Sequence, residues 1–238
     1  MLSFVFPAYN EADNLRRFPA EVFPAFDALR EPYEIVVVDD GSRDDTAEVA
    51  RSLGEPVRLV PHARNMGLGA AIKTGIAAAR GDLIITMDSD LTFAPTLVPA
   101  LLARFRQGDV DVVCGSPKLA GFAPNIPAYR IGMSKVATLL YSVVLGRRVT
   151  AVSPIFRLYR REDVQGLDVK TNGFDINAEI LFKLIQAGKR IAEIPAPLTQ
   201  RLHGESKLVY SKEIQRHLRL LGTMAKWRCA QWVGVARG

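Results

Sequence analysis

The sequence has few cysteines and no long uncharged segment. Its 238 residues include only two cysteines, Cys114 and Cys229, which lie far apart and match neither a metal-binding nor a disulfide framework. The longest apolar stretch near the middle, Val136 to Gly146, has 11 residues. A membrane span requires roughly 18 or more. No basic leader with an apolar region precedes the first strand-like residues. We therefore expect a cytoplasmic protein that does not span a membrane.

Two nucleotide-binding motifs are incomplete. Gly67 and Gly69 begin a segment similar to the dinucleotide fingerprint, but Ile72 occupies the position of the third glycine. The segment also lacks the Gly-Lys-Ser/Thr of a phosphate-binding loop. These absences disfavour dinucleotide-dependent oxidoreduction and P-loop hydrolysis. We expect the glycines to permit a tight loop and close helix packing, with Arg64 or backbone N–H groups available to a phosphate.

The composition is that of one globular domain with a basic surface. Hydrophobic residues make up 48% of the chain, which is enough for a substantial core. The formal net charge is +6 and the sequence pI about 9.5. This charge favours an anionic partner: nucleic acid, an anionic membrane surface or a phosphorylated substrate.

Apolar strands alternate with helices along residues 1–116. Such alternation predicts a mostly parallel sheet with helices on both faces. Strands are expected at 2–6, 33–38, 57–60, 83–87 and 110–115. Helices are expected at 11–30, with breaks at Pro19 and Pro24, and at 45–53, 67–79 and 95–105.

The second half is less regular. Its pattern predicts a loop at 118–127, a helix at 129–145, a strand at 153–159, a helix at 174–186, a strand at 191–194 and a polar loop at 199–208. A basic amphipathic helix follows at 212–232, which docks on the body, binds a partner or lies on a membrane. We expect one catalytic domain over 1–210, with halves 1–116 and 117–210, followed by this helix in 211–238.

Polar residues follow three of the predicted strands. They are Pro7-Ala8-Tyr9-Asn10-Glu11, Asp39-Asp40 and Asp88-Ser89-Asp90. Ligands of parallel sheets collect at the carboxyl ends of strands, so these residues are expected in one crevice. Asp88 and Asp90 repel each other unless a cation compensates them, and their oxygens beside a substrate phosphate suit Mg2+ or Mn2+. An Asp-x-Asp alone also fits a capped turn.

The order of four motifs is more specific than any one of them. Phe-Pro-Ala-Tyr-Asn-Glu, Val-Val-Asp-Asp-Gly-Ser, Arg-Asn-x-Gly-Leu-Gly and Met-Asp-Ser-Asp-Leu together closely resemble the inverting family 2 glycosyltransferases of the GT-A fold. Arg130-x-x-x-Ser134, Gly173-Phe174 with Glu179, and Arg201 to Lys207 look like the dolichyl-phosphate mannose and glucose synthase branch. The resemblance covers roughly residues 3 to 210.

The resemblance implies a role for each matching residue. Asp88 and Asp90 would hold the divalent metal, and Arg201 and Lys207 would close over the diphosphate. Asp90 and Glu179 would act with these two cations in catalysis, with Glu179 orienting the site. The nucleotide would contact Pro7, Ala8, Tyr9, Glu11, Asp39, Asp40, Arg64 and Asp88. The acceptor phosphate would contact Lys118, Arg130 and Ser134, and the apolar rest of that helix would meet a polyprenyl chain.

The chain departs from the family pattern in three places. Pro117-Lys118 stands where the synthases usually have Arg, so the expected phosphate-binding Arg is missing unless Lys118 substitutes for it. Thr92 replaces a Gln that would be a better metal ligand, and Val152 to Arg157 replaces a Gly-Gly-Phe-Arg segment. These departures leave open which sugar is transferred and which lipid accepts it. The sequence also does not settle GDP against UDP, or mannose against glucose or an N-acetyl sugar.

The expected reaction is inverting transfer of a hexose from a nucleotide sugar to a polyprenyl phosphate, at the cytoplasmic face of a membrane or beside a membrane-anchored partner. An anionic phosphate needs positioning rather than a strong base, whereas a saccharide hydroxyl would need Glu179 or Asp175 as its base. A nucleic-acid-binding protein would explain the pI but not three acidic strand ends, so no nucleic-acid partner is expected. A nucleotidyltransferase would be identified by pyrophosphate release.

Overall fold

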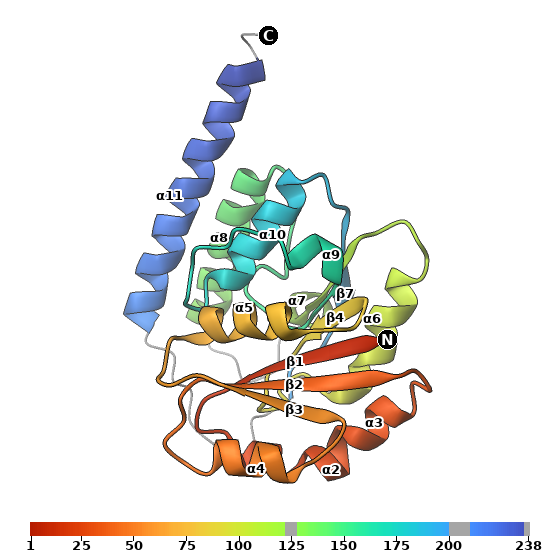
Figure 1. Cartoon of the computed structure of the whole chain (residues 1–238). Helices are drawn as coiled ribbons and strands as arrows, with labels where there is room; N and C mark the ends of the chain where they lie inside the picture. Colours follow the sequence, from red (N-terminus) through yellow and green to blue (C-terminus); the bar gives the residue numbers. More distant parts are fainter. Residues whose placement is uncertain (122–127, 200–209, 236–238) are drawn as a thin grey trace.

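Within the part of the chain that the structure describes, seven strands form one central sheet (Figure 1). The computed structural model describes residues 1–121, 128–199 and 210–235, except the side chains at 128–131, 133, 210–212 and 230–235. The strands are β1 (Leu2–Ala8), β2 (Tyr33–Asp39), β3 (Val57–Pro61), β4 (Leu83–Thr86), β5 (Val112–Ser116), β6 (Arg157–Arg160) and β7 (Ile191–Pro195). Their order is β3-β2-β1-β4-β6-β5-β7. Only β6 runs antiparallel to its neighbours, which confirms a mostly parallel sheet.

Helices cover both faces of the sheet because successive side chains of its buried strands point to opposite sides. Phe4 and Phe6 pack with α1 (Ala12–Leu15), α2 (Phe18–Glu21), α3 (Phe23–Asp27), α4 (Thr46–Ser52) and α6 (Val98–Phe105). Val5 faces the other core, formed with α5 (Leu68–Ala78), α8 (Ala128–Leu145), α9 (Arg161–Val164) and α10 (Ile176–Gln186). The predicted α/β class is confirmed, and the helix expected at 11–30 consists of three short helices.

Two predictions for the second half were wrong in detail. The segment predicted as a loop from Lys118 begins as the short helix α7 (Pro117–Ala120), which Ser116 caps by accepting from Leu119 N at 3.3 Å through its hydroxyl oxygen. In the first half, the helix predicted from Pro95 begins as a 3-10 turn, η1 (Pro95–Leu97), ahead of α6. The strand predicted from Ser153 begins only at Arg157, because carbonyls before it accept side-chain hydrogen bonds instead of ladder bonds. Most of the predicted loop at 199–208 lies outside the described residues.

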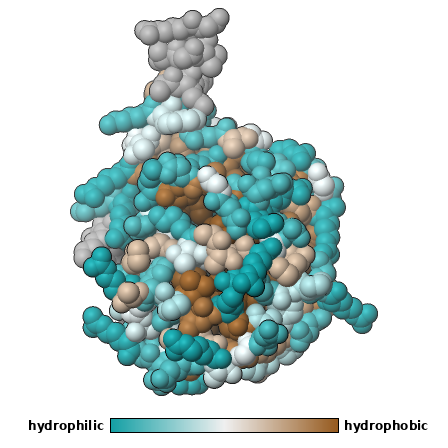
Figure 2. Space-filling model, viewed as in Figure 1, coloured by the Kyte–Doolittle hydropathy of each residue, from teal (hydrophilic) through white to brown (hydrophobic). Residues whose placement is uncertain are grey.

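The predicted tail helix is α11 (Tyr210–Val235), which runs along the body beside α8 and projects beyond it (Figure 1). It docks on the body through Leu220 and Met224, while Ile214 and Leu218 remain exposed. Among the described helices, none is both long enough and apolar enough to cross a bilayer. Figure 2 shows a mostly hydrophilic face in this view, with hydrophobic groups visible in two areas of the body.

The strand order reverses at β1 and so locates the functional edge of the sheet. The chain runs outward from β1 to β2 and β3, then returns to place β4 on the other side of β1. The carboxyl ends of β1, β2 and β4 therefore meet at a topological switch point, where open α/β sheets bind ligands.

Candidate active site

Asp88 and Asp90 lie directly after β4 at this switch point. Ser89 between them is buried, and its hydroxyl donates to Pro7 O on β1 at 3.0 Å. Asp90 is also buried, its Oδ1 accepts from Thr92 N at 3.0 Å, and the following Leu91 has φ of 58°. One hydrogen bond to β1 and one within the turn thus hold the two carboxylates in place.

Asp39 and Asp40 end β2 beside them, and their oxygens organise two loops. Asp39 accepts from Ser42 N at 3.0 Å. Asp40 accepts from the backbone N–H groups of Met66 and Gly67, both at 2.8 Å, and from His62 Nδ1 at 2.7 Å. Asp40, a predicted nucleotide contact, therefore also fixes the loop that carries Arg64.

Gly41 explains how that loop reaches the crevice. Its φ is +68°, and a Cβ atom there would lie 2.4 Å from the backbone carbon of Arg64. Only glycine allows this close approach in a left-handed conformation. The loop brings Arg64, whose side chain is exposed, to the end of β2.

The other predicted nucleotide residues lie at the end of β1. Pro7 and Ala8 are its last residues, and Ala8 O accepts from Asp40 N at 2.8 Å. Tyr9 follows and is partly exposed. Glu11 donates through its backbone N to Thr46 Oγ1 at 2.8 Å and accepts from Asn14 Nδ2 at 2.6 Å. The structure thus brings the predicted pocket residues of β1 and β2 together with Asp88.

Glu179 connects the second half of the chain to this crevice. It is buried in α10 and accepts from Lys170 N at 3.0 and 3.1 Å and from Thr171 N at 2.8 Å, with Lys183 Nζ at 3.7 Å. The loop it holds packs on Gly69, whose N–H donates to Asn172 O at 2.8 Å. The expected close packing at this glycine is confirmed, since a Cβ there would lie 2.7 Å from Asn172.

Lys118 and Ser134 are brought together on the neighbouring side. Lys118 Nζ donates to Ser134 O at 2.9 Å and to Thr138 Oγ1, so α7 is tied to α8. Burial of the ammonium lowers the pKa of Lys118, and the nearby Glu193 carboxylate partly offsets this effect. Arg130 lies in α8, but its side chain is outside the described part, as are Arg201 and Lys207.

Arg157 is an important residue that the sequence reasoning passed over. Its side chain is fully buried at the start of β6 and donates to Asn177 O, Ala151 O and Val152 O at 2.5 to 2.8 Å. It thereby holds the segment before β6 against α10. The only sequence signal was a charged residue at the end of Ile155-Phe156-Arg157, ahead of an apolar strand.

Comparison with known proteins agrees with this arrangement. The model of the family described as glycosyl transferase family 2 matches residues 3–167. The chain belongs to this family. It is 35% identical over 233 residues to a dolichol-phosphate mannosyltransferase of Pyrococcus furiosus, covering 95% of this chain and 64% of that relative. It is 31% identical to an undecaprenyl-phosphate mannosyltransferase of Micrococcus luteus over 86% of each chain.

Solved structures support the GT-A fold of this family 2 chain. Glucosyl-3-phosphoglycerate synthase from Mycobacterium tuberculosis, in complex with phosphoglyceric acid, aligns with a TM-score of 0.70 and 22% identity, covering 97% of this chain and 80% of that chain. The same enzyme in complex with Mn2+, UDP and glucosyl-3-phosphoglycerate aligns with a TM-score of 0.69, 21% identity and the same coverage. At this identity the likeness concerns the fold.

The donor set of this family 2 chain fits a divalent metal that shares its ligands with a substrate. Among residues 1–121, 128–199 and 210–235, no three His, Cys, Asp or Glu side chains are grouped to enclose a metal. Asp88 and Asp90 offer two carboxylates at the end of one strand. Mg2+ is usually bound by one or two carboxylates together with substrate phosphates, so a pair of carboxylates at this edge of the sheet is an appropriate set.

Proposed function

We propose that this chain transfers a hexose, of mannose or glucose type, from a GDP- or UDP-sugar to a polyprenyl phosphate, with inversion and with Mg2+ or Mn2+. The observation that carries the proposal is the meeting of Asp39, Asp88 and Asp90 at the switch point. The chain spans 64% of the Pyrococcus relative, and the activity named for that relative supports the proposal.

In this mechanism the nucleotide lies against the ends of β1 and β2, where Tyr9, Asp39 and Arg64 contact it. Asp88 and Asp90 would hold the metal, which supplies Lewis-acid stabilisation to the leaving diphosphate. Arg201 and Lys207 add positive charge to the same phosphates. An oxygen of the acceptor phosphate attacks C1 of the sugar as the bond from C1 to the diphosphate oxygen breaks, which inverts C1 and releases the nucleoside diphosphate.

The acceptor site is proposed at Lys118, Arg130 and Ser134, where α7 meets the start of α8. The second pKa of such a phosphate is about 6, so it is largely dianionic near neutral pH and needs no strong base. This fits Glu179, whose oxygens accept backbone N–H groups and whose role is to orient the loop at 170–172. Asp175, the other candidate base for a hydroxyl acceptor, is buried too, and burial raises its pKa.

The proposed location is peripheral, at the cytoplasmic face of the membrane that holds the acceptor. The exposed Ile214 and Leu218 of α11 support a contact with that surface, directly or beside an anchored partner. The face that carries Leu220 and Met224 is already used against the body.

The test is transfer of labelled hexose from GDP-mannose and UDP-glucose to a polyprenyl phosphate with Mn2+, compared with EDTA. We expect a mild-acid-labile lipid product that EDTA abolishes. Asp90→Asn keeps the oxygen that accepts from Thr92 N but removes the charge, and should lower transfer by about a thousandfold. Asp82→Asn, at the opposite end of β4, is the matched control and should keep activity.

Two results would overturn the proposal. One is full transfer by Asp90→Asn, which would remove the metal assignment. The other is glycosylation of a saccharide, or pyrophosphate release from a nucleoside triphosphate, with no lipid product for any sugar donor.

A further inference from the structure

Glu193 of β7 is a carboxylate that the proposed mechanism does not use. Its oxygens accept from Thr150 N at 2.8 and 3.0 Å, from Thr150 Oγ1 at 2.7 Å and from Ala151 N at 2.6 Å. Within residues 1–121, 128–199 and 210–235 it forms no ion pair. Its partners there are neutral groups of one short segment, so its negative charge remains available to act on its surroundings.

The Thr150 hydroxyl connects this carboxylate to the helix that carries Lys118. Thr150 Oγ1 lies 2.7 Å from Ser116 Oγ, which in turn accepts from Leu119 N and so caps α7. A hydroxyl carries one proton, and the carboxylate can only accept, so Thr150 donates to Glu193 and Ser116 donates to Thr150. A directed series of hydrogen bonds thus runs from α7 to the carboxylate.

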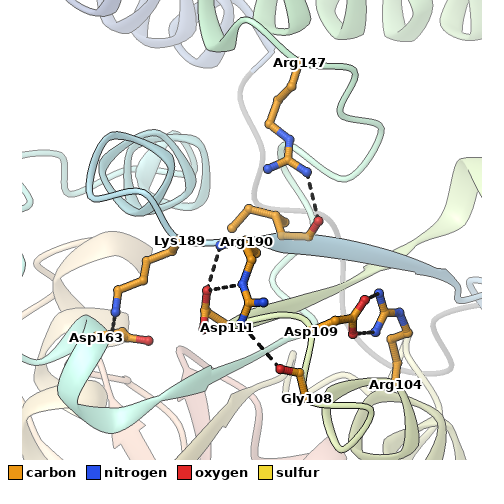
Figure 3. Close-up of polar contacts among 9 residues, drawn as sticks. Arg104, Gly108, Asp109, Asp111, Arg147, Asp163, Lys189 and Arg190 are labelled. Atoms are coloured by element: carbon orange, nitrogen blue, oxygen red, sulfur yellow. Dashed lines mark hydrogen bonds and ion pairs between the residues drawn. The ribbon is translucent and has the colours of Figure 1, made fainter.

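The start of β7 is anchored, which gives Glu193 a fixed position. Arg147 donates to Ile191 O at 3.0 Å, as Figure 3 shows. Two residues later, Glu193 pairs with Cys114, which lies two residues before Ser116 on β5. Paired residues and every second residue of a strand point to the same face of a sheet, so the Glu193 and Ser116 side chains share one face.

Lys118 is half-buried among groups of its own charge. It lines a cleft of about 630 Å³ whose lining includes three further cations, Lys135, Arg147 and Arg148, and no acidic residue. The hydrogen-bond partners of its ammonium, Ser134 O and Thr138 Oγ1, are neutral. Burial lowers the pKa of Lys118, and the carboxylate of Glu193 opposes that shift. Glu193 is thus the described group whose charge favours a protonated Lys118.

We propose that Glu193 is a positioning residue for the acceptor phosphate, because it holds the hydroxyl pair that fixes the helix of Lys118. The proposal rests on the proposed function, in which Lys118 contacts that phosphate. The two hydroxyls determine where the ammonium lies, and the carboxylate sustains its charge as the pH rises. An arginine would stay charged without such help, whereas a buried lysine titrates more readily. Glu193 therefore assists acceptor binding without touching the acceptor.

The first measurement is a pH titration of the Lys118 amine in the full chain by NMR with isotope-labelled lysine. Lys118→Arg assigns the signal by removing it. Glu193→Gln keeps one acceptor oxygen and the shape of the side chain but removes the charge. The Lys118 titration should move to lower pH in Glu193→Gln, because the effect of burial is then no longer opposed.

Glu34→Gln is the matched control. Glu34 also accepts a backbone N–H, from Arg80 at 2.6 Å, but lies near the start of β2, at the opposite edge of the sheet. It removes the same charge from the chain at a distance over which salt screens the effect. The Lys118 titration should therefore stay at its wild-type position in Glu34→Gln.

The second measurement is the acceptor KM from about pH 7 to about pH 9.5, a range in which the acceptor phosphate stays dianionic. Glu193→Gln should raise this KM by about tenfold at the alkaline end and by less than about twofold at pH 7, with the donor KM unchanged. In the Lys118→Arg background, the same change should have less than about a twofold effect throughout, because the guanidinium stays protonated.

A further variant separates the hydroxyl pair from the charge. Thr150→Val keeps the carboxylate but removes the bond between it and Ser116. It should raise the acceptor KM by about fivefold at every pH, which is the loss of one neutral hydrogen bond, and leave the Lys118 titration in place. Thermal melting checks that each variant is folded.

Three results would overturn the role of Glu193. The first is an unchanged Lys118 titration in Glu193→Gln, and the second is an equal shift in Glu34→Gln, which would indicate a general effect of net charge. The third is a pH-dependent rise in acceptor KM that persists in the Lys118→Arg background. A titration shift as expected, without glycosylation of any prenyl phosphate, would reject the proposed function and leave the coupling of Glu193 to Lys118 in place.

Discussion

The two halves of the chain carry opposite charge. Residues 1–116 contain 11 Lys and Arg against 17 Asp and Glu, whereas residues 117–238 contain 20 against 8, so their formal net charges are −6 and +12. The overall value of +6 therefore describes neither half. The negative half suits a metal and its nucleotide sugar, and the positive half suits an anionic acceptor at an anionic surface.

In each half, some charged side chains are bonded to neutral backbone groups. In the nucleotide half, Asp39 and Asp40 accept from backbone N–H groups, which fixes loops without neutralising the carboxylates. In the acceptor half, Arg157, Lys118 and Arg147 donate to backbone carbonyls. A hydrogen bond to a neutral group satisfies a polar atom but leaves its charge to act on a ligand.

The largest effect is expected from removing the buried cation of the acceptor half, Arg157. Arg157→Ala leaves the carbonyls of Ala151, Val152 and Asn177 without their donor and opens a cavity. We expect a loss of about 3–5 kcal/mol in the free energy of unfolding, measured with urea.

The matched control is Arg160→Ala in the same strand. Arg160 lies over the Phe105 ring at 4.8 Å from its centroid and is partly exposed, so its loss should cost less than about 1 kcal/mol. Equal losses for the two variants would show that Arg157 does not organise the acceptor half through these carbonyls.

The corresponding change in the nucleotide half is Asp40→Ala. It leaves the N–H groups of Met66 and Gly67 without their acceptor, and we expect a loss of about 2 kcal/mol in unfolding free energy. Nucleotide-sugar affinity, measured by calorimetry, should fall while the KM for the acceptor stays constant.

Asp45→Ala is the control for Asp40→Ala, because Asp45 is exposed. In the part of the chain that the structure describes, its one ion pair is with Arg16, at 3.4 Å. Surface pairs of this kind contribute less than about 1 kcal/mol. A change in acceptor KM with Asp40→Ala would mean that the halves are less independent than their charges suggest.

Much of the fold and part of the site were predictable because the signals are local. Apolar runs such as Ile35 to Val38, each followed by acidic residues, identify buried strands and the edge where their ends lie. The three acidic strand ends follow from this pattern without knowledge of any contact. Gly67 and Gly69 indicated a tight loop and close packing, although the residue that both approach, Asn172, is distant in sequence.

The remaining features depend on contacts between distant segments. Nothing near Asp40 indicates that it accepts from Met66, and nothing near Glu179 indicates that it holds Lys170. The strand predicted from Ser153 begins late because Arg157 and Asn177 bind the carbonyls before it. Arg147 likewise donates to Ile191 O only because the end of α8 lies beside the start of β7. Periodicity cannot encode such pairings, since each one requires the tertiary fold.

The smallest expected effect concerns an additional positive charge inside the acceptor half. His217 of α11 lies with Nδ1 2.6 Å from the hydroxyl of Tyr141 of α8. Burial lowers the pKa of His217, although the carboxylates of Asp175 and Glu213 oppose that shift. The unfolded imidazole has a pKa of about 6.5, so below that pH the unfolded chain binds a proton that the folded chain excludes. Stability should therefore fall as the pH decreases from about 7.5 to about 5.5.

His217→Gln isolates this effect because its amide remains neutral and can accept from Tyr141. Asp175 titrates with the opposite sign, since burial raises the pKa of its carboxyl and protonation favours the folded state at low pH. It is present in both proteins, but its carboxyl and the His217 imidazole influence each other's pKa, so the comparison reports His217 together with this coupling. We expect Tm to fall by about 2 °C more in the wild type than in His217→Gln over this pH range. An equal change in Tm for the two proteins would mean that the contact between α8 and α11 tolerates a protonated His217. The positive charge of this half would then not be confined to its surface.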